Sequence, residues 1–511
     1  MAHALLSYRG TSGIPCRPRS TTIVDLPPDV LLIIFRYVSK DAELPGDSNG
    51  IHSRLAAFLD PWPSHHDRYL DHPFPESLAS IRPLWRSIMS NISIFWTRLV
   101  IWIGRDPTPL SRIHQYLSWS QDRPLDIYVY RRFDQSVQDP NEKARIDAIF
   151  ELLLPHVKRW RTLHMHLLCS SSLPLPRVDL VGRADRLVTL VLRFIFDDLI
   201  DSTGSTSHLE DEFETPVLRN LFMGGVHFRE SYVRPFPRLA MPPKLSSVAI
   251  TDYNSHNVAF PLVDLLACLV GCTHLSSLEL DSVCLDCSYT GPHIITAEMR
   301  LPRWSANVKF IDISGDVITE YSRLLDYPVV DSVSYRRCTT AVPLGATLTD
   351  GYNVGMFEIH SPTVLFSLLA AAPEDFSFCE TQFEDCDGLT TDVLRKLAEP
   401  MHDPDAEAEW VLQGTWLCPN MKSIHVLACT QFRSADMRAL LEARRRVHAA
   451  TGFADADSPG FLVSSVDQLY VRGCCELAPE DEVWLDVNVP RVHWDDWKGG
   501  YDRPGLRRQI S

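Results

Sequence analysis

Residues 245–280 read LSSVAITDYNSHNVAFPLVDLLACLVGCTHLSSLEL, and the stretch begins and ends on the same six-residue pattern. In LSSVAI and again in LSSLEL, apolar residues stand at the first, fourth and sixth positions, which predicts a short strand with one buried face. Between the two, residues 261–270 carry apolar residues at helical spacing. One strand followed by one helix is therefore the predicted structural unit.

The same pattern recurs along the chain at nearly constant intervals. It begins at residues 160, 187, 218, 245, 275 and 308, so successive starts lie 27, 31, 27, 30 and 33 residues apart. Its apolar sets are Trp160, Leu163, Met165; Leu187, Leu190, Leu192; Leu218, Leu221, Met223; Leu245, Val248, Ile250; Leu275, Leu278, Leu280; and Val308, Ile311, Ile313. This layout resembles an irregular leucine-rich-repeat solenoid, although the asparagine that usually follows the pattern is missing in most units. The repeated positions are expected to form one continuous core.

Flanking segments extend the array in both directions. On the N-terminal side, a helical face (Leu110, Ile113, Tyr116, Leu117) precedes an alternating strand (Leu125, Ile127, Val129). On the C-terminal side the pattern is less regular, with strands predicted at Val330, Val333, Tyr335; Met421, Ile424, Val426; and Val466, Leu469, Val471, and a helix over 435–449. The tail beyond Leu477 contains Trp484, Trp494 and Trp497, and it either caps the array or is loosely ordered.

A helical module precedes the array. In DLPPDVLLIIFRYVSK, which begins at Asp25, the proline pair suits a helix entry and apolar residues follow at helical spacing. In residues 75–99, PESLASIRPLWRSIMSNISIFWTRL, Pro83 stands where one short helix is expected to end and the next to begin. Residues 41–75 intervene, and their Pro, Gly, Asp and His content predicts a long loop.

These helical residues resemble the F-box, a three-helix motif of substrate adaptors in cullin-RING ubiquitin ligases, in the style of the large families of mushroom-forming fungi. The matching positions are Leu26, Pro27, Asp29, Val30, Leu31, Ile34, Phe35, Val38, Trp85, Arg86, Phe95 and Trp96. The resemblance covers about residues 21–100, and the insertion 41–75 departs from the motif. It implies that a Skp-type adaptor, itself bound to a cullin scaffold, contacts residues drawn from Leu26, Pro27, Asp29, Val30, Ile34, Phe35 and Trp85.

Composition excludes several classes of function. The 511-residue chain has 49 Lys plus Arg against 65 Asp plus Glu, a net charge of -16, so it lacks the basic footprint of a nucleic-acid-binding protein. No uninterrupted apolar window is long enough to predict a membrane span. The 13 cysteines are odd in number and scattered, which favours a reducing intracellular compartment, cytoplasmic or nuclear.

Motifs for catalysis or cofactor binding are missing. The sequence has no G-x-G-x-x-G, P-loop, G-x-S-x-G or H-E-x-x-H pattern, so we expect neither an enzyme nor a cofactor. Some residues are of types that bind metals. Cys268, Cys272, Cys284 and Cys287 have a zinc-like spacing. The other candidates are His65, His66, Asp67 and His72 in the 41–75 insertion, and His164 and His166 beside a strand. A predicted strand separates the cysteine pairs, and the histidines lie in a loop or share one strand face. We therefore interpret the four cysteines as buried thiols and expect no metal.

The sequence as a whole predicts an α/β fold in four parts. A leader (1–20), an F-box-like module (21–100), an irregular leucine-rich-repeat solenoid (101–475) and an acidic, Trp-containing tail or cap (476–511) follow one another. The resemblance implies a substrate-recognition subunit of a Skp-cullin-F-box ubiquitin ligase, which binds a target protein through its repeats. Candidate recognising residues beside the strands are Thr251, Asp252, Glu279, Asp281, Asp312 and Arg472. Acidic stretches at 210–214, 374–387 and 403–409 favour a basic target.

Two other functions remain open at this point. One is a leucine-rich-repeat scaffold without a ligase role, whose N-terminal helices only cover the first apolar edge of the array. The other is an enzyme with an unrecognised site among the repeats.

Overall fold

The computed structural model describes residue 23 and residues 26–42, 74–132, 139–199, 213–236, 239–254, 258–294, 307–326, 329–339, 350–370, 379–400, 416–451 and 463–502. Contacts divide the chain into two compact units, Met1–Arg98 with His114–Arg123, and Leu99–Ile113 with Pro124–Ser511. Some sequence predictions fall outside the described residues: the leader, most of the 41–75 insertion with His65, His66, Asp67 and His72, and the acidic stretch 403–409.

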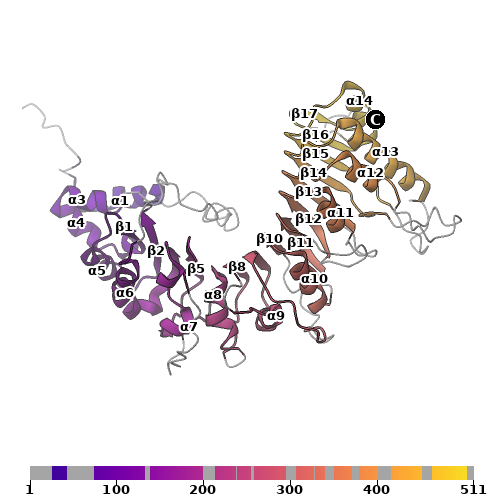
Figure 1. The fold of residues 1–511 in the computed structure, drawn as a ribbon. Helices are drawn as coiled ribbons and strands as arrows, with labels where there is room; N and C mark the ends of the chain where they lie inside the picture. The colour runs from indigo at the N-terminus through magenta and orange to yellow at the C-terminus, as the bar shows by residue number, and fades with distance from the viewer. Residues whose placement is uncertain are drawn as a thin grey trace, which may run out of the picture. The chain divides into compact units, whose positions relative to one another are not determined.

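The strands of the second unit form one long sheet (Figure 1). Over the described ranges it contains fifteen strands, and each pairs with the next one along the chain apart from the short β4 and β6, which pair with each other. The strands of the long sheet are β1 (Arg98–Gly104), β2 (Leu125–Arg132), β3 (Trp160–His166), β5 (Thr189–Arg193), β7 (Asn220–Gly224), β8 (Ser247–Tyr253), β9 (Ser277–Val283), β10 (Asn307–Ile311), β11 (Val329–Arg336), β12 (Asp350–Phe357), β13 (Glu380–Glu384), β14 (Ser423–Leu427), β15 (Gln468–Arg472), β16 (Arg491–Trp494) and β17 (Trp497–Gly499). From β2 to β16 the described pairs are parallel.

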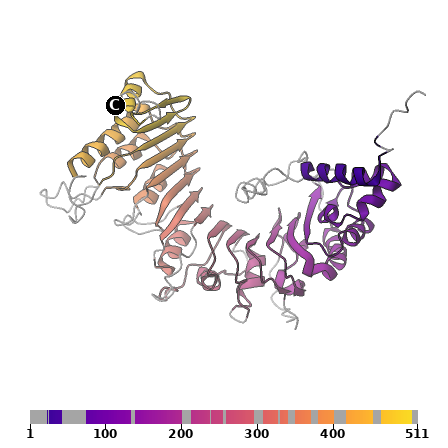
Figure 2. The same cartoon turned by 180° about the vertical axis from the view of Figure 1, so that it is seen from behind.

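Parallel neighbours need crossover connections, and helices provide most of them. The helices of this unit are α6 (Glu142–Leu153), α7 (Pro176–Asp179), α8 (Gly225–Phe228), α9 (Leu262–Val270), α10 (Gly315–Leu324), α11 (Pro362–Ala370), α12 (Thr391–Ala398), α13 (Ser434–Thr451) and α14 (Pro479–Asn488). Figures 1 and 2 show α9 to α13 along the same face of the sheet. The predicted helices at 261–270 and 435–449 correspond to α9 and α13.

Because side chains alternate along a strand, two residues of each strand point into the core, and these residues line up across the sheet as two rows. The first row consists of Leu163, Leu190, Leu221, Val248, Leu278, Val308, Val333, Val354, Thr381, Ile424, Leu469 and Val492. The second consists of Met165, Leu192, Met223, Ile250, Leu280, Phe310, Tyr335, Met356, Phe383, Val426, Val471 and Trp494. Every member is at most 2% exposed, which confirms the strand-and-helix unit predicted from the sequence.

One predicted unit is wrong in register by three residues. Val308 pairs with Leu278 and Phe310 pairs with Leu280, so Phe310 holds the core position. Ile311 therefore pairs with Asp281 on the opposite face of the sheet. Val308, Ile311 and Ile313 have the spacing of the repeat pattern by chance. In the strand itself, alternate residues from Val308 onward are buried, so Phe310 and not Ile311 faces the core.

Two strands and one helical position also differ from the sequence prediction. Strands β12 and β13 were not predicted, because each lacks one apolar anchor: Gly351 stands at the first anchor of the β12 unit, and Thr381 stands at the second anchor of the β13 unit. In the lead-in unit, α5 (Leu110–Trp119) and β2 form as predicted. Leu110, however, is 44% exposed at the first residue of α5, whereas Ile113 and Leu117 on the same face are buried.

Four cysteines stand at the same position after their strands. Three residues after the second core row, Cys338, Cys386, Cys429 and Cys474 follow β11, β13, β14 and β15. The Cys386 thiol donates to the Met356 carbonyl at 3.2 Å, and the Cys386 N–H donates to Cys429 Sγ at 3.4 Å. The Cys429 N–H donates in turn to Cys474 Sγ at 3.4 Å. Thiols thus satisfy the backbone groups of successive turns inside the array.

The C-terminal tail caps the sheet rather than being loosely ordered. Strand β16 adds in parallel to β15, and β17 pairs antiparallel with β16 at the edge. Trp494 is 2% exposed, and its indole N–H donates to the Cys475 carbonyl at 3.0 Å. A short terminal hairpin limits the edge available for pairing with another chain. Across the described ranges, no helix combines the length and apolarity needed to cross a bilayer.

The first unit contains α1 (Pro28–Ala42), α3 (Glu76–Ile81), α4 (Pro83–Ser90) and the short helix η2 (Ser93–Trp96). Extended Arg82 separates α3 from α4, and Pro83 opens α4, as predicted. The Trp96 indole N–H donates to the Met89 carbonyl at 2.8 Å. Its ring packs edge-on against Tyr116 and Trp119, so the end of α5 belongs to this core.

Candidate interaction surfaces

The helical module has a core that two of the predicted adaptor residues build. Phe35, which is 1% exposed, meets Trp85 edge-on with ring centroids 5.2 Å apart, and Leu31 is fully buried beside it on α1. Aromatic contacts of this kind add to the free energy gained from burial alone. Phe35 and Trp85 therefore hold α1 against α4 and are not available to a partner.

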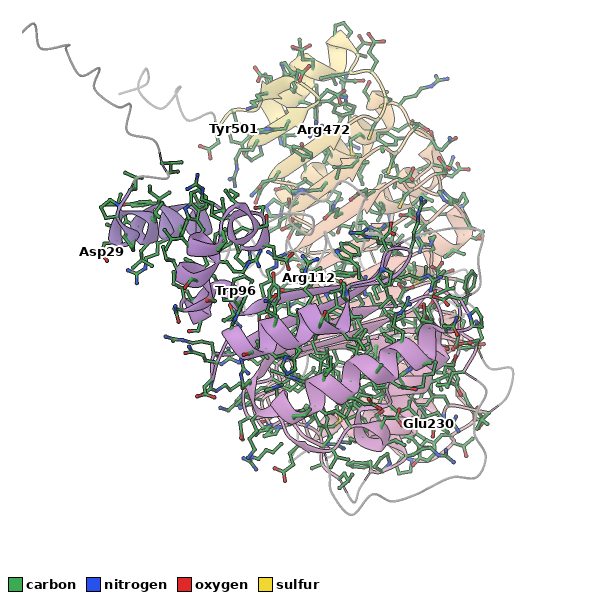
Figure 3. All side chains as sticks on the ribbon, turned by 90° about the vertical axis from the view of Figure 1, so that its left-hand side faces the viewer. Asp29, Trp96, Arg112, Glu230, Arg472 and Tyr501 are labelled. Atoms are coloured by element: carbon green, nitrogen blue, oxygen red, sulfur yellow. The ribbon has the colours of Figure 1, made fainter. Side chains whose placement is uncertain are left out.

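The other predicted adaptor residues lie at or near the surface. Pro27, Asp29 and Val30 are exposed, whereas Leu26 and Ile34 are half-buried. We define the outer face of α1 as Asp29, Val30, Ile33, Arg36 and Tyr37, which share one side of the helix and are all exposed; Asp29 is labelled in Figure 3. Ile33 and Tyr37 are 53% and 68% exposed, and the sequence prediction did not include them.

Three further exposed apolar side chains belong to the same unit. Ile81 at the end of α3, Leu84 in α4 and Ile94 in η2 are 50–56% exposed. Large apolar residues exposed singly are ordinary, but several in one small module are informative. Sequence spacing gave a signal for two of them, since Leu84 and Ile94 fall outside the helical face that contains Trp85. Ile81 shares the spacing of Trp85 and would be assigned to the buried face, but it is exposed.

The face of the sheet opposite the core rows is defined by three rows of side chains, which we call the open face. The first row is Thr162, Thr189, Asn220, Ser247, Ser277, Asn307, Ser332, Asn353, Glu380, Ser423, Gln468 and Arg491. The central row is His164, Val191, Phe222, Ala249, Glu279, Lys309, Ser334, Gly355, Gln382, His425, Tyr470 and His493, and the third is His166, Arg193, Gly224, Thr251, Asp281, Ile311, Arg336, Phe357, Glu384, Leu427 and Arg472.

The structure places the sequence-predicted recognition residues on or beside this open face. Thr251 and Asp281 are register partners in the third row, and Glu279 lies in the central row. Asp252 and Asp312 follow the third row directly, with a φ of 51° and 52°. Arg472, labelled in Figure 3, lies in the third row on β15 and is distant from the others in strand order.

Opposite charges alternate along the middle of the open face. Lys309 Nζ lies 3.5 Å from Glu279 Oε2, and Arg337 donates to both Asp312 oxygens at 2.6–3.0 Å. Arg337 also donates to Glu358 at 2.6 Å. Burial raises the pKa of Asp281, and neighbouring carboxylates raise it further. At protein interfaces in general, alternating charges select a partner by complementarity and suppress mismatched ones.

Aromatic rings gather toward both ends of the open face. At β2 and β3, Tyr130 meets His164 edge-on at 5.2 Å, but both rings are buried, so they support the sheet and offer no contact area. At β14 to β16, His425 stacks on Tyr470 at 5.7 Å, and Tyr470 lies 6.0 Å from His493. Aromatic side chains are enriched at protein interfaces, because each contributes a large contact area. The sequence reasoning considered His164 only as a metal-like residue and missed the other rings, although each stands one residue after a strand anchor.

Two buried histidines on this face make stability depend on pH. Burial, with a smaller contribution from Arg193, lowers the pKa of His164 to about 3 and that of His166 to about 4. An unfolded imidazole titrates near 6.5, so between these values the unfolded chain binds more protons and stability falls as pH falls. We expect a lower urea midpoint at pH 5 than at pH 7, and His164→Gln should remove roughly 2 kcal/mol of that loss. The same pH dependence in His164→Gln and the parent chain would contradict this assignment.

Metal-ligating residue types do not converge in the part of the chain that the structure describes. There, no three His, Cys, Asp or Glu side chains form a group able to hold an ion. Cys268 and Cys272 are buried, and burial raises the pKa of each thiol to about 12. Cys284 is exposed and Cys287 is half-buried, so the interpretation of all four cysteines as buried thiols is wrong for this pair. The raised pKa values of Cys268 and Cys272 disfavour the thiolate form in which cysteine binds zinc.

Comparison with known proteins adds no relative: a scan against models of protein families finds no match, and a search of the curated proteins finds none either.

Proposed function

We propose that this chain is a substrate-recognition subunit of a Skp-cullin-F-box type ubiquitin ligase. The F-box-like module would bind a Skp-type adaptor, and an irregular leucine-rich-repeat array would bind the target protein through its open face. The chain itself would perform no chemistry, since ubiquitin transfer needs only that the target be held near the ligase. The sequence resemblance of residues 21–100 to the F-box suggests the adaptor.

One observation carries the adaptor part of the proposal. Seven large apolar side chains of the first unit are exposed, namely Ile23, Val30, Ile33, Tyr37, Ile81, Leu84 and Ile94. Only nine others are exposed in the much longer described part of the second unit. The repeat units bury their apolar residues almost completely, so the exposed set of the module favours a partner that covers it.

The open face supports the target-binding part of the proposal. Alternating charges at Glu279, Lys309 and Asp312 and rings such as Tyr470 are the side-chain types that give protein interfaces specificity and contact area. A deep pocket uniting perturbed acids and bases would favour an enzyme instead. Burial lowers the pKa of His164 and His166 on this face, so both are neutral near pH 7 and offer no poised proton donor.

Co-purification tests this function directly. Full-length chain and the Skp-type adaptor, expressed together, are expected to elute as a 1:1 complex in size-exclusion chromatography with light scattering. Adding the N-terminal domain of a cullin should extend the complex. Folded full-length chain that elutes alone, at adaptor concentrations of about 10 μM, would overturn the ligase role and leave the repeat scaffold as the function.

A further inference from the structure

One residue near the end of each strand from β8 to β13 has a left-handed backbone. It follows the third row of the open face directly and has a φ of 51–55°; the six residues are Asp252, Ser282, Asp312, Arg337, Glu358 and Asp385. Glycine, asparagine and aspartate suit this conformation best. After β15 a glycine holds the same position, since Gly473 has a φ of 63°. The backbone therefore does not require a charged side chain here, although five of the six residues carry one.

Carboxylates outnumber cations along this end of the open face. We call it the acidic edge and define it as these six residues together with the third-row residues of β8 to β13. Its charged members are six carboxylates, Asp252, Asp281, Asp312, Glu358, Glu384 and Asp385, and two guanidinium groups, Arg336 and Arg337. Beside the edge stand Glu279, Lys309 and Arg193, which interacts electrostatically with the carboxylates of β8 and β9. With these three included, seven carboxylates still face only four cations.

The two guanidinium groups of the edge are already engaged. Arg336 donates to Glu358 at 2.6 Å, and Arg337 donates to both Glu358 and Asp312 at 2.6 Å. Within the described ranges, by contrast, Asp252, Asp281 and Asp385 form no ion pair. The negative charge that remains is thus carried by carboxylates at both ends of the edge.

A buried carboxylate adds to the charge at the β9 end. Glu279 shares the face of β9 with Asp281, is 7% exposed, and its Oε1 has no hydrogen-bond partner. Lys309 Nζ lies 3.5 Å from the other oxygen, and the register neighbour on β8 is Ala249, which offers no side-chain donor. The pKa of Asp281 is raised, first by burial and then by the carboxylates around it, Glu279 among them. A cation brought to this place would offset that repulsion.

We propose that the acidic edge binds a basic, extended segment of the target protein. Its lysine or arginine side chains pair with Asp252, Asp281 and Asp385. Neighbouring strands lie about 4.8 Å apart, so six strands span about 24 Å, the length of about seven extended residues. The inference rests on the proposed function in one respect, namely that the open face is the surface that receives the target.

An octapeptide of alternating lysine and serine tests the edge on full-length protein. By isothermal titration at about 50 mM salt we expect saturable binding with a Kd on the order of 100 μM, since exposed ion pairs are individually weak. At about 500 mM salt the Kd should rise at least about tenfold, because salt screens exposed charges. A peptide with glutamine in place of lysine should not bind.

Paired variants locate the binding. Asp252→Asn combined with Asp281→Asn keeps the side-chain shape and removes two charges, so the Kd for the lysine peptide should rise about tenfold. Glu151→Gln combined with Glu480→Gln removes the same charge from exposed positions on α6 and α14, and its Kd should stay within about twofold of that of the parent chain. Asp385→Asn, at the exposed far end of the edge, should raise the Kd about threefold by itself.

Each outcome decides the proposal. No saturable binding of the lysine peptide, equal affinity for the glutamine peptide, or equal losses in the two double variants would overturn it, the last because net charge alone would then explain binding. If the Asp252 and Asp281 double variant has a lowered melting temperature, an unchanged Kd in Asp385→Asn overturns the proposal instead. Adaptor binding without peptide binding would remove this inference and keep the ligase role, whereas peptide binding without adaptor binding would do the reverse.

Discussion

Ile33→Glu is expected to weaken binding of the Skp-type adaptor by at least about a hundredfold while the chain stays folded. Ile33 is 53% exposed at the centre of the outer face of α1, between Val30 and Tyr37. If this face is the proposed contact, the variant buries an unpaired carboxylate in an apolar interface, which costs several kcal/mol. An exposed helical position loses little stability, typically within about 0.5 kcal/mol. Isothermal titration with purified adaptor gives the Kd, and circular dichroism gives the melting temperature.

Val487→Glu is the matched control for this prediction. Val487 is a 65% exposed aliphatic residue on α14 of the second unit, so the variant makes the same change of charge on another exposed helix face. Its Kd for the adaptor should equal that of the parent chain. Equal affinity of Ile33→Glu and Val487→Glu would exclude the outer face of α1 as the contact, and a lowered melting temperature in both would assign the loss to folding.

Glu142→Ala is expected to destabilise the second unit by about 3–5 kcal/mol. Glu142 is 2% exposed at the start of α6, and its Oε2 accepts from the buried Arg131 Nη1 at 2.7 Å. Its oxygens also accept from the Leu168 and Cys169 N–H groups at 3.3 and 3.1 Å. The variant leaves a buried guanidinium and two backbone donors without this partner, and each carries a desolvation penalty. Urea denaturation followed by circular dichroism measures the loss.

Glu151→Ala on the same helix controls for a lost acidic side chain. Glu151 is exposed, so its removal should change the free energy of unfolding by no more than about 0.5 kcal/mol. A Glu142→Ala variant with the urea midpoint of Glu151→Ala would contradict the account of the buried ion pair.

The repeating strands were predictable because their core positions recur at a fixed spacing in the sequence. Where the pattern was regular, from Trp160 to Leu280, every anchor is buried as predicted. It failed where a strand lacks one anchor, as at Thr381, or where chance spacing imitates the pattern, as at Ile311. The apolar spacing shows that residues alternate between the two faces of a strand. Only pairing with the neighbouring strand decides which of the two alternating sets of residues is buried.

The candidate surfaces were predictable in part. Positions next to a strand anchor face away from the core, which placed Thr251, Glu279 and Asp281 correctly on the open face. Which of Val30 and Phe35 meets solvent depends on how α1 rolls against Trp85, and a helical pattern alone leaves that roll undetermined. Arg444 makes the same point, since it stands in a run of three arginines yet is fully buried. It donates to the Leu417, Cys418 and Pro419 carbonyls, and burial lowers its pKa to about 10.

The sequence by itself determined the period of the array, the alternation within its strands and the residues that match the F-box, because these depend on local spacing along the chain. Only the tertiary structure decided what lies between repeats: the cysteine ladder of Cys386, Cys429 and Cys474, the register at Val308, and the capping hairpin of β16 and β17. It also decided the pocket between Arg229 and the start of α9. Each of these joins residues about 25 or more positions apart or requires a backbone turn that the apolar pattern does not encode, so packing had to select it.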